Sequence, residues 1–388
     1  METPKKKVLF LIPTLAAGGA ERVVSELSKH APDHIELVLV VFEKKVSYEF
    51  RGRVESLAVP VTSPILPRFP RFFLRWWRLR KLLTKEKPDS VVSFGYSADL
   101  LNILCNRKAV IRVDMFLSAG RRGVFGSFTK LIAKVLFRRA ALILAVAHAI
   151  KEDLIQAFGV PEQRIRVIPN PIDMQRIQQL AREPLPVEYQ HIFGKPVVVT
   201  MGRLTRQKGQ WHLLKAFGYI KSKAPEAQLV VLGEGVLKDQ LRALAADLGI
   251  EKQVHFLGWQ ENPYRFLGKA RVFALSSLWE GLPMVLLEAM ACGLPVVSTD
   301  CKSGPKEILD PDIGILTPVC ARDWGTMGKE ISREEQLLGQ ALLRVLGDKE
   351  YAALLAQKSL SRAQDFDNSR VLGQYDFLWK EMFYEKRL

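Results

Sequence analysis

The chain has 388 residues, of which 48% are hydrophobic and 25% are charged, so it is long enough for two domains and is not a disordered chain, a collagen-like repeat or a disulfide-stapled mini-protein. Its formal net charge is +16, and residues 1–173 carry 29 Lys and Arg against 16 Asp and Glu. The first half therefore predicts a basic face and an anionic partner, which is a nucleic acid, a phosphorylated substrate or a membrane surface.

The amino terminus is predicted to form the first buried strand of a domain. Lys5, Lys6 and Lys7 precede the apolar run 8–12, which is the order found in a short signal peptide. Pro13 ends that run, however, and a Gly-Gly-Ala-Glu sequence follows. No apolar run approaches the roughly 20 residues of a membrane span, and none of the four cysteines forms a Cys-x-x-Cys pair. We expect a cytoplasmic protein that does not cross the membrane.

Short apolar runs alternate with amphipathic stretches along the whole chain. Because these runs show no polar alternation, they predict strands covered on both faces and joined by helices in parallel sheets. The predicted strands are 8–12, 37–42, 91–94, 110–113, 142–146 and 165–168, then 197–201, 228–232, 254–257, 272–275 and 295–299. Two such series predict an α/β chain of two doubly wound, Rossmann-like domains that face each other across a ligand-binding cleft.

The domain boundary is expected where the apolar runs stop. Residues 174–195 contain several prolines and no long apolar run, so they are predicted to be a linker. The N-terminal domain would then span 1–173 and the C-terminal domain 196–369. A terminal helix at about 370–388 is expected to pack back on the first domain.

Paired glycines, Gly18 and Gly19, follow the first predicted strand and precede a helical stretch. Glycines at such a turn allow the backbone to approach a ligand closely. The Gly-x-Gly-x-x-Gly fingerprint of dinucleotide sites follows none of the predicted strands.

Residues 68–81 are predicted to form a basic amphipathic helix with an arginine stripe beside an aromatic stripe. The residues expected to contact lipid are Arg68, Arg71, Phe72, Arg75, Trp76 and Arg78. A second stretch, 121–139, also mixes cations with apolar residues. Such helices lie on anionic membrane surfaces; the alternative is a helix whose aromatic side packs on the sheet and whose arginines face solvent. No nucleic-acid-binding motif is found, so nucleic acid is not an expected partner.

The loop after the predicted strand 197–201 carries Arg203 and Lys208 between two glycines. Arginine binds phosphate oxygens in a bidentate fork, and lysine adds a point charge. The loop therefore predicts phosphate binding at the carboxyl end of that strand, with a solvated basic turn as the alternative.

Segment 276–295 carries the most specific pattern in the chain. Pro283 fits the first turn of a helix and Gly293 fits the position after its end. The amino terminus of this helix would point at the carboxyl end of a parallel sheet, where it forms an anion site. Glu280 and Glu288 flank the site, and carboxylates accept hydrogen bonds from hydroxyls such as those of a ribose or hexose. Each glutamate alone is also explained by the helix dipole or by a solvated face, but together they predict a sugar-nucleotide site.

These motifs together resemble the retaining nucleotide-sugar glycosyltransferases of family 4, which have the GT-B fold. The resemblance rests on two motifs. The first is Gly-Arg-Leu followed by Lys-Gly within residues 202–209, and the second is Glu-Gly-Leu-Pro followed by Glu-Ala within residues 280–289. Further matching pieces occur in the same order, namely the Gly-Gly-Ala-Glu loop, 167–173, 232–235, 256–258 and 303–308. The similarity extends over nearly the whole chain.

The resemblance implies a role for each matched residue. Arg203 and Lys208 would hold the donor diphosphate, Glu280 would contact the donor hexose, and Glu288 would bind the ribose. Arg203, Lys208 and Glu280 are therefore the expected catalytic residues. The other expected donor-binding residues are Gly18, Gly19, Leu257, Gly258, Trp259, Gly281, Leu282, Pro283, Met284 and Val285, with the nucleobase near residues 257–259.

The chain departs at one position from the family that it resembles. Many relatives have a histidine near the end of the fifth N-terminal strand, where this chain has Arg112 and Asp114. These two residues, with His148, are expected on the acceptor or reacting-sugar side. The alternative for each is a structural role, such as an ion pair.

We therefore expect a retaining glycosyltransferase that moves a sugar from a nucleotide donor to a hydroxyl of a lipid-linked saccharide, while bound peripherally to the inner face of the membrane. UDP-HexNAc or UDP-hexose is favoured as the donor, and GDP-mannose stays open. No cofactor or metal is expected, since fixed cations and a helix terminus stabilise diphosphate charge. The alternatives are a glycosyltransferase with a soluble acceptor and a non-catalytic membrane- or polyanion-binding protein with the same fold.

Overall fold

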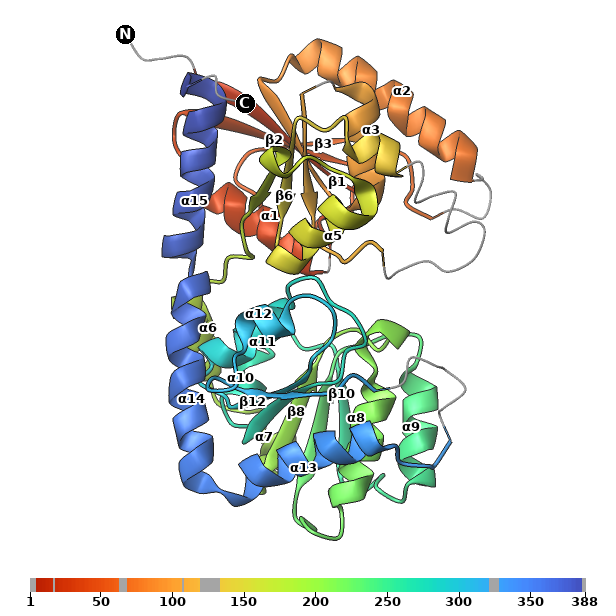
Figure 1. The fold of residues 1–388 in the computed structure, drawn as a ribbon, viewed down its shortest axis with the longest axis vertical. Helices are drawn as coiled ribbons and strands as arrows, with labels where there is room; N and C mark the ends of the chain where they lie inside the picture. The colour runs from red at the N-terminus through yellow and green to blue at the C-terminus, as the bar shows by residue number, and fades with distance from the viewer. Residues whose placement is uncertain are drawn as a thin grey trace. The chain divides into compact units, whose positions relative to one another are not determined.

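The computed structural model describes residues 5–16, 18–62, 68–106, 108–118, 133–320 and 328–385. The chain divides into two compact units, of which one combines Met1–Pro171 with Ser369–Leu388 and the other is Ile172–Asn368. Each unit consists of helices packed on a parallel sheet (Figure 1). Much of the second basic stretch expected from the sequence, residues 119–132, lies outside the described residues.

The first unit has a parallel sheet with the order β3-β2-β1-β4-β5-β6-β7 in the described part of the chain. Its strands are β1 (Lys6–Ile12), β2 (Ile35–Val41), β3 (Arg53–Ser56), β4 (Ser90–Phe94), β5 (Ala109–Val113), β6 (Leu142–Ala145) and β7 (Ile165–Val167). Its described helices are α1 (Gly19–Lys29), α2 (Arg68–Glu86), α3 (Tyr96–Cys105), α5 (His148–Phe158) and α15 (Asn368–Lys380). The inner strands are rich in Val, Ile and Leu and are buried, which follows from helices covering both faces of the sheet.

The second unit has a parallel sheet with the order β10-β9-β8-β11-β12-β13. Its strands are β8 (Val197–Met201), β9 (Gln228–Leu232), β10 (Val254–Gly258), β11 (Val272–Leu275), β12 (Val296–Thr299) and β13 (Ile315–Thr317). Its described helices are α6 (Met174–Ala181), α7 (Val187–Phe193), α8 (Gln210–Ile220), α9 (Lys238–Asp247), α10 (Tyr264–Leu267), α11 (Met284–Ala291), α12 (Pro305–Ile308), α13 (Arg333–Gly347) and α14 (Lys349–Ala363).

Both sheets are doubly wound: the chain enters each sheet near its middle and then winds toward each edge in turn. The strand order reverses between β1 and β4 in the first unit and between β8 and β11 in the second. The connections that leave two such neighbouring strands diverge to opposite faces of the sheet and leave space for a ligand at the carboxyl edge. The loops after β8 and β11 are therefore the place where the fold favours a binding site in the second unit.

The two-domain α/β fold expected from the sequence is confirmed, and each predicted strand is present. Two strands were not predicted, β3 and β13, and both are short strands at a sheet edge. The expectation of a linker over 174–195 needs correction, because this segment contains α6 and α7 and belongs to the second unit. The helix expected near the C-terminus is α15, which groups with the first unit.

Candidate active site

The loops at the carboxyl edge of the second sheet are joined by backbone hydrogen bonds. The Gly202 amide donates to the Leu232 carbonyl over 2.9 Å, and the Gly233 amide donates to the Gly258 carbonyl over 2.7 Å. Gly233 has a φ of +125°, and a Cβ atom there would lie 2.1 Å from the Gly202 carbonyl oxygen. This close approach requires glycine and locks the loops that follow β8, β9 and β10 together.

Lys208 and Glu280 meet at the switch point between β8 and β11. Lys208 ends the short 3-10 turn Arg206–Lys208 after β8, and its Nζ lies 2.7 Å from Glu280 Oε1. Ser277 Oγ donates to the same carboxylate oxygen over 2.6 Å, and Gln207 Nε2 donates to the Trp279 carbonyl over 3.0 Å. The carboxylate is buried, so the lysine and the serine hold it in one orientation. The structure thus unites two residues that the sequence placed 72 positions apart.

Helix α11 begins directly after this pair, with Pro283 as its N-cap. Glu288 lies inside the helix and is buried, and its Oε1 accepts a hydrogen bond from the Tyr264 hydroxyl over 3.3 Å. The predicted helix, with its proline start and Gly293 just beyond its end, is therefore confirmed. Its free amides and dipole point to the carboxyl edge of the sheet, which is an electrostatic environment suited to an anion.

The segment after β12 fixes the turn that leads into α11. Ser303 Oγ donates to the Gly281 carbonyl over 2.9 Å. Gly304 has a φ of +77°, and a Cβ atom there would lie 2.4 Å from the same carbonyl oxygen. Ser303 itself has a φ of +67°, which is strained for a residue with a side chain. The strained turn holds Gly281 in place just ahead of the helix.

The remaining expected donor residues of the second unit lie at the same edge. Arg203 follows β8 and is exposed. Gly258 ends β10, and Trp259 follows it with 69% of its surface exposed. Leu257 is half-buried, Leu282 is buried, and Met284 and Val285 are half-buried in the first turn of α11. Sequence reasoning missed Ser277, Gln207, Tyr264 and Ser303, for which only their proximity to the motifs gave a signal.

The expected site residues of the first unit differ in their position and in their exposure to solvent. Gly18 is the N-cap of α1 and Gly19 its first residue, close after β1. His148 is exposed at the first position of α5, after β6. Arg112, in contrast, is 0% exposed. It pairs with Asp114 and donates to Asn170 Oδ1 and, over 3.2 Å, to the Tyr375 hydroxyl.

This network places Arg112 in the interior of the first unit, with the half-buried Asp114 beside it. Burial opposes the charge of Arg112, but Asp114 and Tyr375 outweigh it and raise the arginine pKa. Burial also raises the pKa of Asp114, and Arg112 opposes that rise. Since Tyr375 lies in α15, the network anchors the C-terminal helix to the end of β5. This geometry matches the alternative expectation for Arg112 and Asp114, in which the two residues form a structural ion pair.

The arginine stripe of α2 also differs from the expectation. Arg71 Nη1 donates to the Val61 carbonyl over 2.7 Å, Arg75 Nη2 to the Pro60 carbonyl over 2.5 Å, and Arg78 Nη1 to the Leu57 carbonyl over 2.5 Å. Phe72 and Trp76 pack against the core formed by the strands and α3. The expectation that these five residues contact lipid is therefore corrected, since they face the body of the unit. The Arg68 side chain lies outside the described part of the structure.

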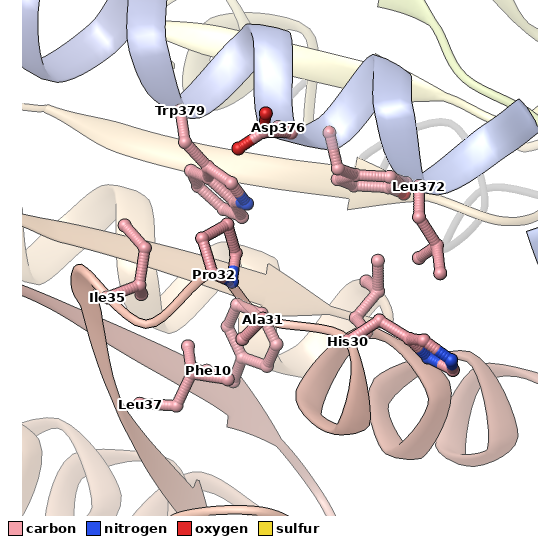
Figure 2. A pocket seen from close by; sticks show the side chains of 11 residues that line it. Phe10, His30, Ala31, Pro32, Ile35, Leu37, Leu372, Asp376 and Trp379 are labelled. Atoms are coloured by element: carbon pink, nitrogen blue, oxygen red, sulfur yellow. The ribbon is translucent and has the colours of Figure 1, made fainter. Parts of the chain in front are cut away.

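Figure 2 shows a small pocket in the first unit beneath α15. Trp379 and Leu372 extend from the helix into the pocket, which Phe10 of β1 also lines. The pocket volume of about 20 Å³ suits a single water molecule, so the pocket reflects the packing of α15. An open recess of about 250 Å³, which includes Lys5 and Arg53, lies near the amino ends of the strands rather than at the carboxyl edge.

Within the described residues, no three His, Cys, Asp or Glu side chains gather in a way that could hold a metal ion. Among the helices in the same described ranges, none is long and apolar enough to cross a bilayer.

The sequence matches two family models, one in each half of the chain. Residues 17–176 match the model described as Glycosyltransferase Family 4, and residues 182–333 match the model described as Glycosyl transferases group 1. An uncharacterized glycosyltransferase of Methanocaldococcus jannaschii is 32% identical over 81% of this chain and 85% of that protein.

A second relative has an assigned reaction. The N-acetylgalactosamine-N,N'-diacetylbacillosaminyl-diphospho-undecaprenol 4-alpha-N-acetylgalactosaminyltransferase of Campylobacter jejuni is 30% identical over 94% of this chain and 97% of that protein. Among solved structures, Anabaena HepE in complex with UDP and glucose superimposes with a TM-score of 0.78 over 97% of this chain and 99% of that one, at 22% identity. That likeness supports the GT-B fold.

Proposed function

The chain belongs to the family 4 glycosyltransferases, and on that premise we propose that it moves a hexose or N-acetylhexosamine from a UDP-linked donor to a hydroxyl of a lipid-linked saccharide. The observation that carries the proposal is the meeting of Lys208, Glu280 and the start of α11 at the switch point of the second unit. This arrangement combines a cation, a carboxylate that accepts from hydroxyls and a helix terminus. A nucleoside diphosphate sugar carries the complementary groups.

Each donor group has a partner of matching chemistry. Arg203 and Lys208 would hold the diphosphate, because both are cations at the end of β8. Glu280 would accept hydrogen bonds from the sugar, and Glu288 from the ribose hydroxyls. The exposed Trp259 indole beside Gly258 would flank the nucleobase. Gly18 and Gly19 remain predicted donor contacts.

The proposed reaction breaks the bond between the anomeric carbon and the phosphate oxygen. The leaving diphosphate gains negative charge, which Arg203, Lys208 and the α11 terminus stabilise more strongly as the bond breaks. The acceptor oxygen bonds to the same face of the sugar, and its proton passes to the leaving phosphate. This front-face route retains the anomeric configuration and requires neither a dedicated base nor a bound metal.

The acceptor assignment rests on the relatives and on the charge of the first half of the chain. The name of the Campylobacter relative specifies a diphospho-undecaprenol saccharide, which is a membrane lipid. The excess of 13 positive charges in residues 1–173 suits an anionic membrane surface. We therefore propose that the protein works peripherally on the cytoplasmic face of a membrane. GDP-mannose as donor, or a soluble acceptor, is the alternative within the family.

A thermal-shift screen tests the donor proposal, since a ligand that binds only the folded state raises the melting temperature. The screen compares UDP-N-acetylglucosamine, UDP-N-acetylgalactosamine, UDP-glucose, UDP-galactose, GDP-mannose and ADP-glucose at equal concentration. At least one UDP-sugar is expected to stabilise the wild type and to have little effect on Glu280→Gln. Stabilisation by GDP-mannose alone would replace the UDP assignment. No shift with any nucleotide sugar would favour a non-catalytic binding protein.

A further inference from the structure

Two ionisable side chains of helix α8 are buried in a helix that is otherwise part of the apolar core. His212 is 1% exposed and Lys215 is 2% exposed, and the residues beside them, such as Leu213 and Phe217, belong to the hydrophobic core of the second unit. His212 and Lys215 are three positions apart, so both side chains lie on one side of the helix. Helix α13 packs against α8 (Figure 1) and carries Glu335, an ionic partner of both.

Glu335 joins the two helices, and we call His212, Lys215 and Glu335 the buried polar cluster. Glu335 Oε1 lies 2.6 Å from His212 Nδ1 and 3.6 Å from Lys215 Nζ. Its Oε2 accepts from the backbone amide of Ser332 over 2.7 Å, in the capping box that starts α13. Both oxygens of this buried carboxylate are therefore engaged. A buried ionic group contributes little net stability compared with apolar side chains, but it can specify one arrangement of the elements that meet there.

The first turn of α8 is bonded to the loop after β8, which carries Arg203 and Lys208. The His212 amide donates to the Gly209 carbonyl over 2.9 Å, and Gln210 Nε2 donates to the Arg203 carbonyl over 3.0 Å. Gly209 has a φ of +58°, and a Cβ atom there would lie 3.4 Å from His212 Cδ2. The His212 side chain therefore lies against the residue that directly follows Lys208.

The same loop is bonded on its other side to the segment after β11. Ser276 Oγ donates to the Lys208 carbonyl over 3.1 Å, and the Leu278 amide donates to the Gln207 carbonyl over 2.8 Å. These bonds hold the loop backbone where the Lys208 ammonium reaches the Glu280 carboxylate. A shift of α8 along α13 would strain these bonds and move Lys208 relative to Glu280.

We propose that the buried polar cluster positions Arg203 and Lys208 for the donor diphosphate by fixing the register of α8 on α13. The inference rests on the proposed function, because the diphosphate is the group that these two cations would hold. His212 and Glu335 are buried between the helices, so they act through the loop and are positioning residues. A displacement of about 1 Å in a group that stabilises developing charge can cost about 100-fold in rate.

Steady-state kinetics of His212 variants test the contact with Glu335. An asparagine amide can place an N–H near the position of His212 Nδ1, whereas leucine cannot. His212→Leu should lower kcat about tenfold or more with a smaller rise in the donor KM, and His212→Asn should retain most of the wild-type kcat. Ile220→Val, at the other end of α8, removes buried volume away from the cluster and should lower the melting temperature but not kcat. A wild-type kcat in His212→Leu, or the same loss in Ile220→Val, would contradict the positioning role.

Glu335→Gln tests the other side of the same contact while keeping the size of the side chain. The glutamine oxygen can still accept from the Ser332 amide, but no anion remains beside His212 and Lys215. Its kcat should fall about tenfold, again with a smaller change in the donor KM. Glu350→Gln removes one negative charge from an exposed position of α14 and should leave both constants unchanged. Equal kinetics of the two glutamine variants would contradict the proposal.

Hydrogen exchange followed by mass spectrometry tests the loop without any nucleotide sugar. The amides of Leu204 and Lys208 donate to backbone carbonyls, so they exchange when the loop opens. Exchange in a peptide covering residues 203–209 should be about tenfold faster in His212→Leu than in the wild type, and close to wild type in His212→Asn and Ile220→Val. Unchanged exchange in His212→Leu would overturn the inference. Faster exchange in that variant, together with no turnover of any nucleotide sugar by the wild type, would refute the proposed function and leave the positioning of the loop intact.

Discussion

At the residue scale, Glu288 depends on its neighbour Tyr264. The carboxylate is buried in α11 and accepts from the Tyr264 hydroxyl, so its orientation is set before a ligand arrives. Glu288→Ala should weaken UDP-sugar binding by about 1.5–3 kcal/mol, the value of a hydrogen bond to a charged group. Tyr264→Phe should have a smaller effect, because the carboxylate stays but loses one partner.

Calorimetric titration with the preferred donor measures both effects. Glu251→Ala removes an exposed carboxylate of the same unit and serves as the control, with an affinity equal to that of the wild type. Unchanged donor affinity in Glu288→Ala would remove Glu288 from the site.

Arg203 is expected to act mainly in the transition state. Its side chain is exposed on the loop after β8, and charge grows on the diphosphate as the glycosyl bond breaks. Arg203→Ala should therefore lower kcat by about 100-fold or more with a smaller rise in KM. Steady-state kinetics check this split. A normal kcat with a raised KM would mean that Arg203 only anchors the donor.

Asp99 gives the first unit a pH-dependent stability. It is fully buried beside Ser93, whose Oγ donates to Asp99 Oδ1 over 2.7 Å, and burial raises the Asp99 pKa well above its usual value of 3.8. A raised folded-state pKa contributes stability that is complete below the unfolded-state pKa and is lost as pH rises through the folded-state value. The melting temperature of Asp99→Asn minus that of the wild type should therefore increase from pH 4 upward. A difference independent of pH would contradict a raised pKa.

At the element scale, the arginines and aromatic residues of α2 could have faced either the sheet or the solvent. Sequence periodicity placed arginines and aromatics on adjacent stripes, and both stripes exist. It could not tell which one faces inward, because the carbonyl groups of residues 57–61 that attract Arg71, Arg75 and Arg78 belong to a separate segment. The exposed aromatics Phe69, Phe73 and Trp77 became apparent only when the core was known.

The arginine contacts of α2 should contribute measurably to stability. Arg75 is buried, donates to the Pro60 carbonyl and lies 4.4 Å from the Phe42 ring centroid. Arg75→Met should lower the free energy of unfolding by about 1.5–3 kcal/mol, because a partly buried carbonyl loses a charged donor. Lys81→Met, on the exposed side, should change it by less than about 0.5 kcal/mol. Urea unfolding compares the two, and equal values would contradict the inward role of Arg75.

The strands show what a sequence can and cannot predict. Inner strands such as β1 and β8 are buried on both faces and therefore form continuous apolar runs, which is why each was predicted. The edge strand β3 has the sequence Arg-Val-Glu-Ser, with exposed and half-buried side chains. Its position depends on pairing with β2 rather than on its own composition.

At the scale of the whole molecule, the sequence identified the expected binding residues of the candidate site but not the residues that hold them in place. Lys208 and Glu280 each belong to a motif, and the doubly wound sheet brings them to 2.7 Å. Ser277 and Tyr264 hold Glu280 and Glu288, yet a single serine or tyrosine near a motif has no distinctive spacing. From the sequence, Arg112 could lie on the acceptor or reacting-sugar side or have a structural role. The hydrogen bond to Tyr375, 263 positions away along the chain, shows that Arg112 belongs to a buried network.

The proposed chemistry uses fixed cations in place of a bound metal. EDTA should therefore leave the transfer rate within about twofold of its value in buffer, because Arg203, Lys208 and the α11 terminus stabilise the leaving group. Initial rates with and without EDTA measure this. Complete loss of activity that Mg²⁺ restores would contradict the metal-independent mechanism.

The central claim is transfer from a UDP-sugar to a lipid-linked saccharide, and a transfer assay with the purified full chain tests it most directly. Radiolabelled UDP-sugars are incubated with a polyprenyl-diphosphate-linked saccharide in anionic vesicles, and the label is counted after organic extraction. The label from at least one UDP-sugar should enter the lipid fraction with the wild type and not with Glu280→Gln. Label that reaches only soluble saccharides, or that comes only from GDP-mannose, would contradict the account.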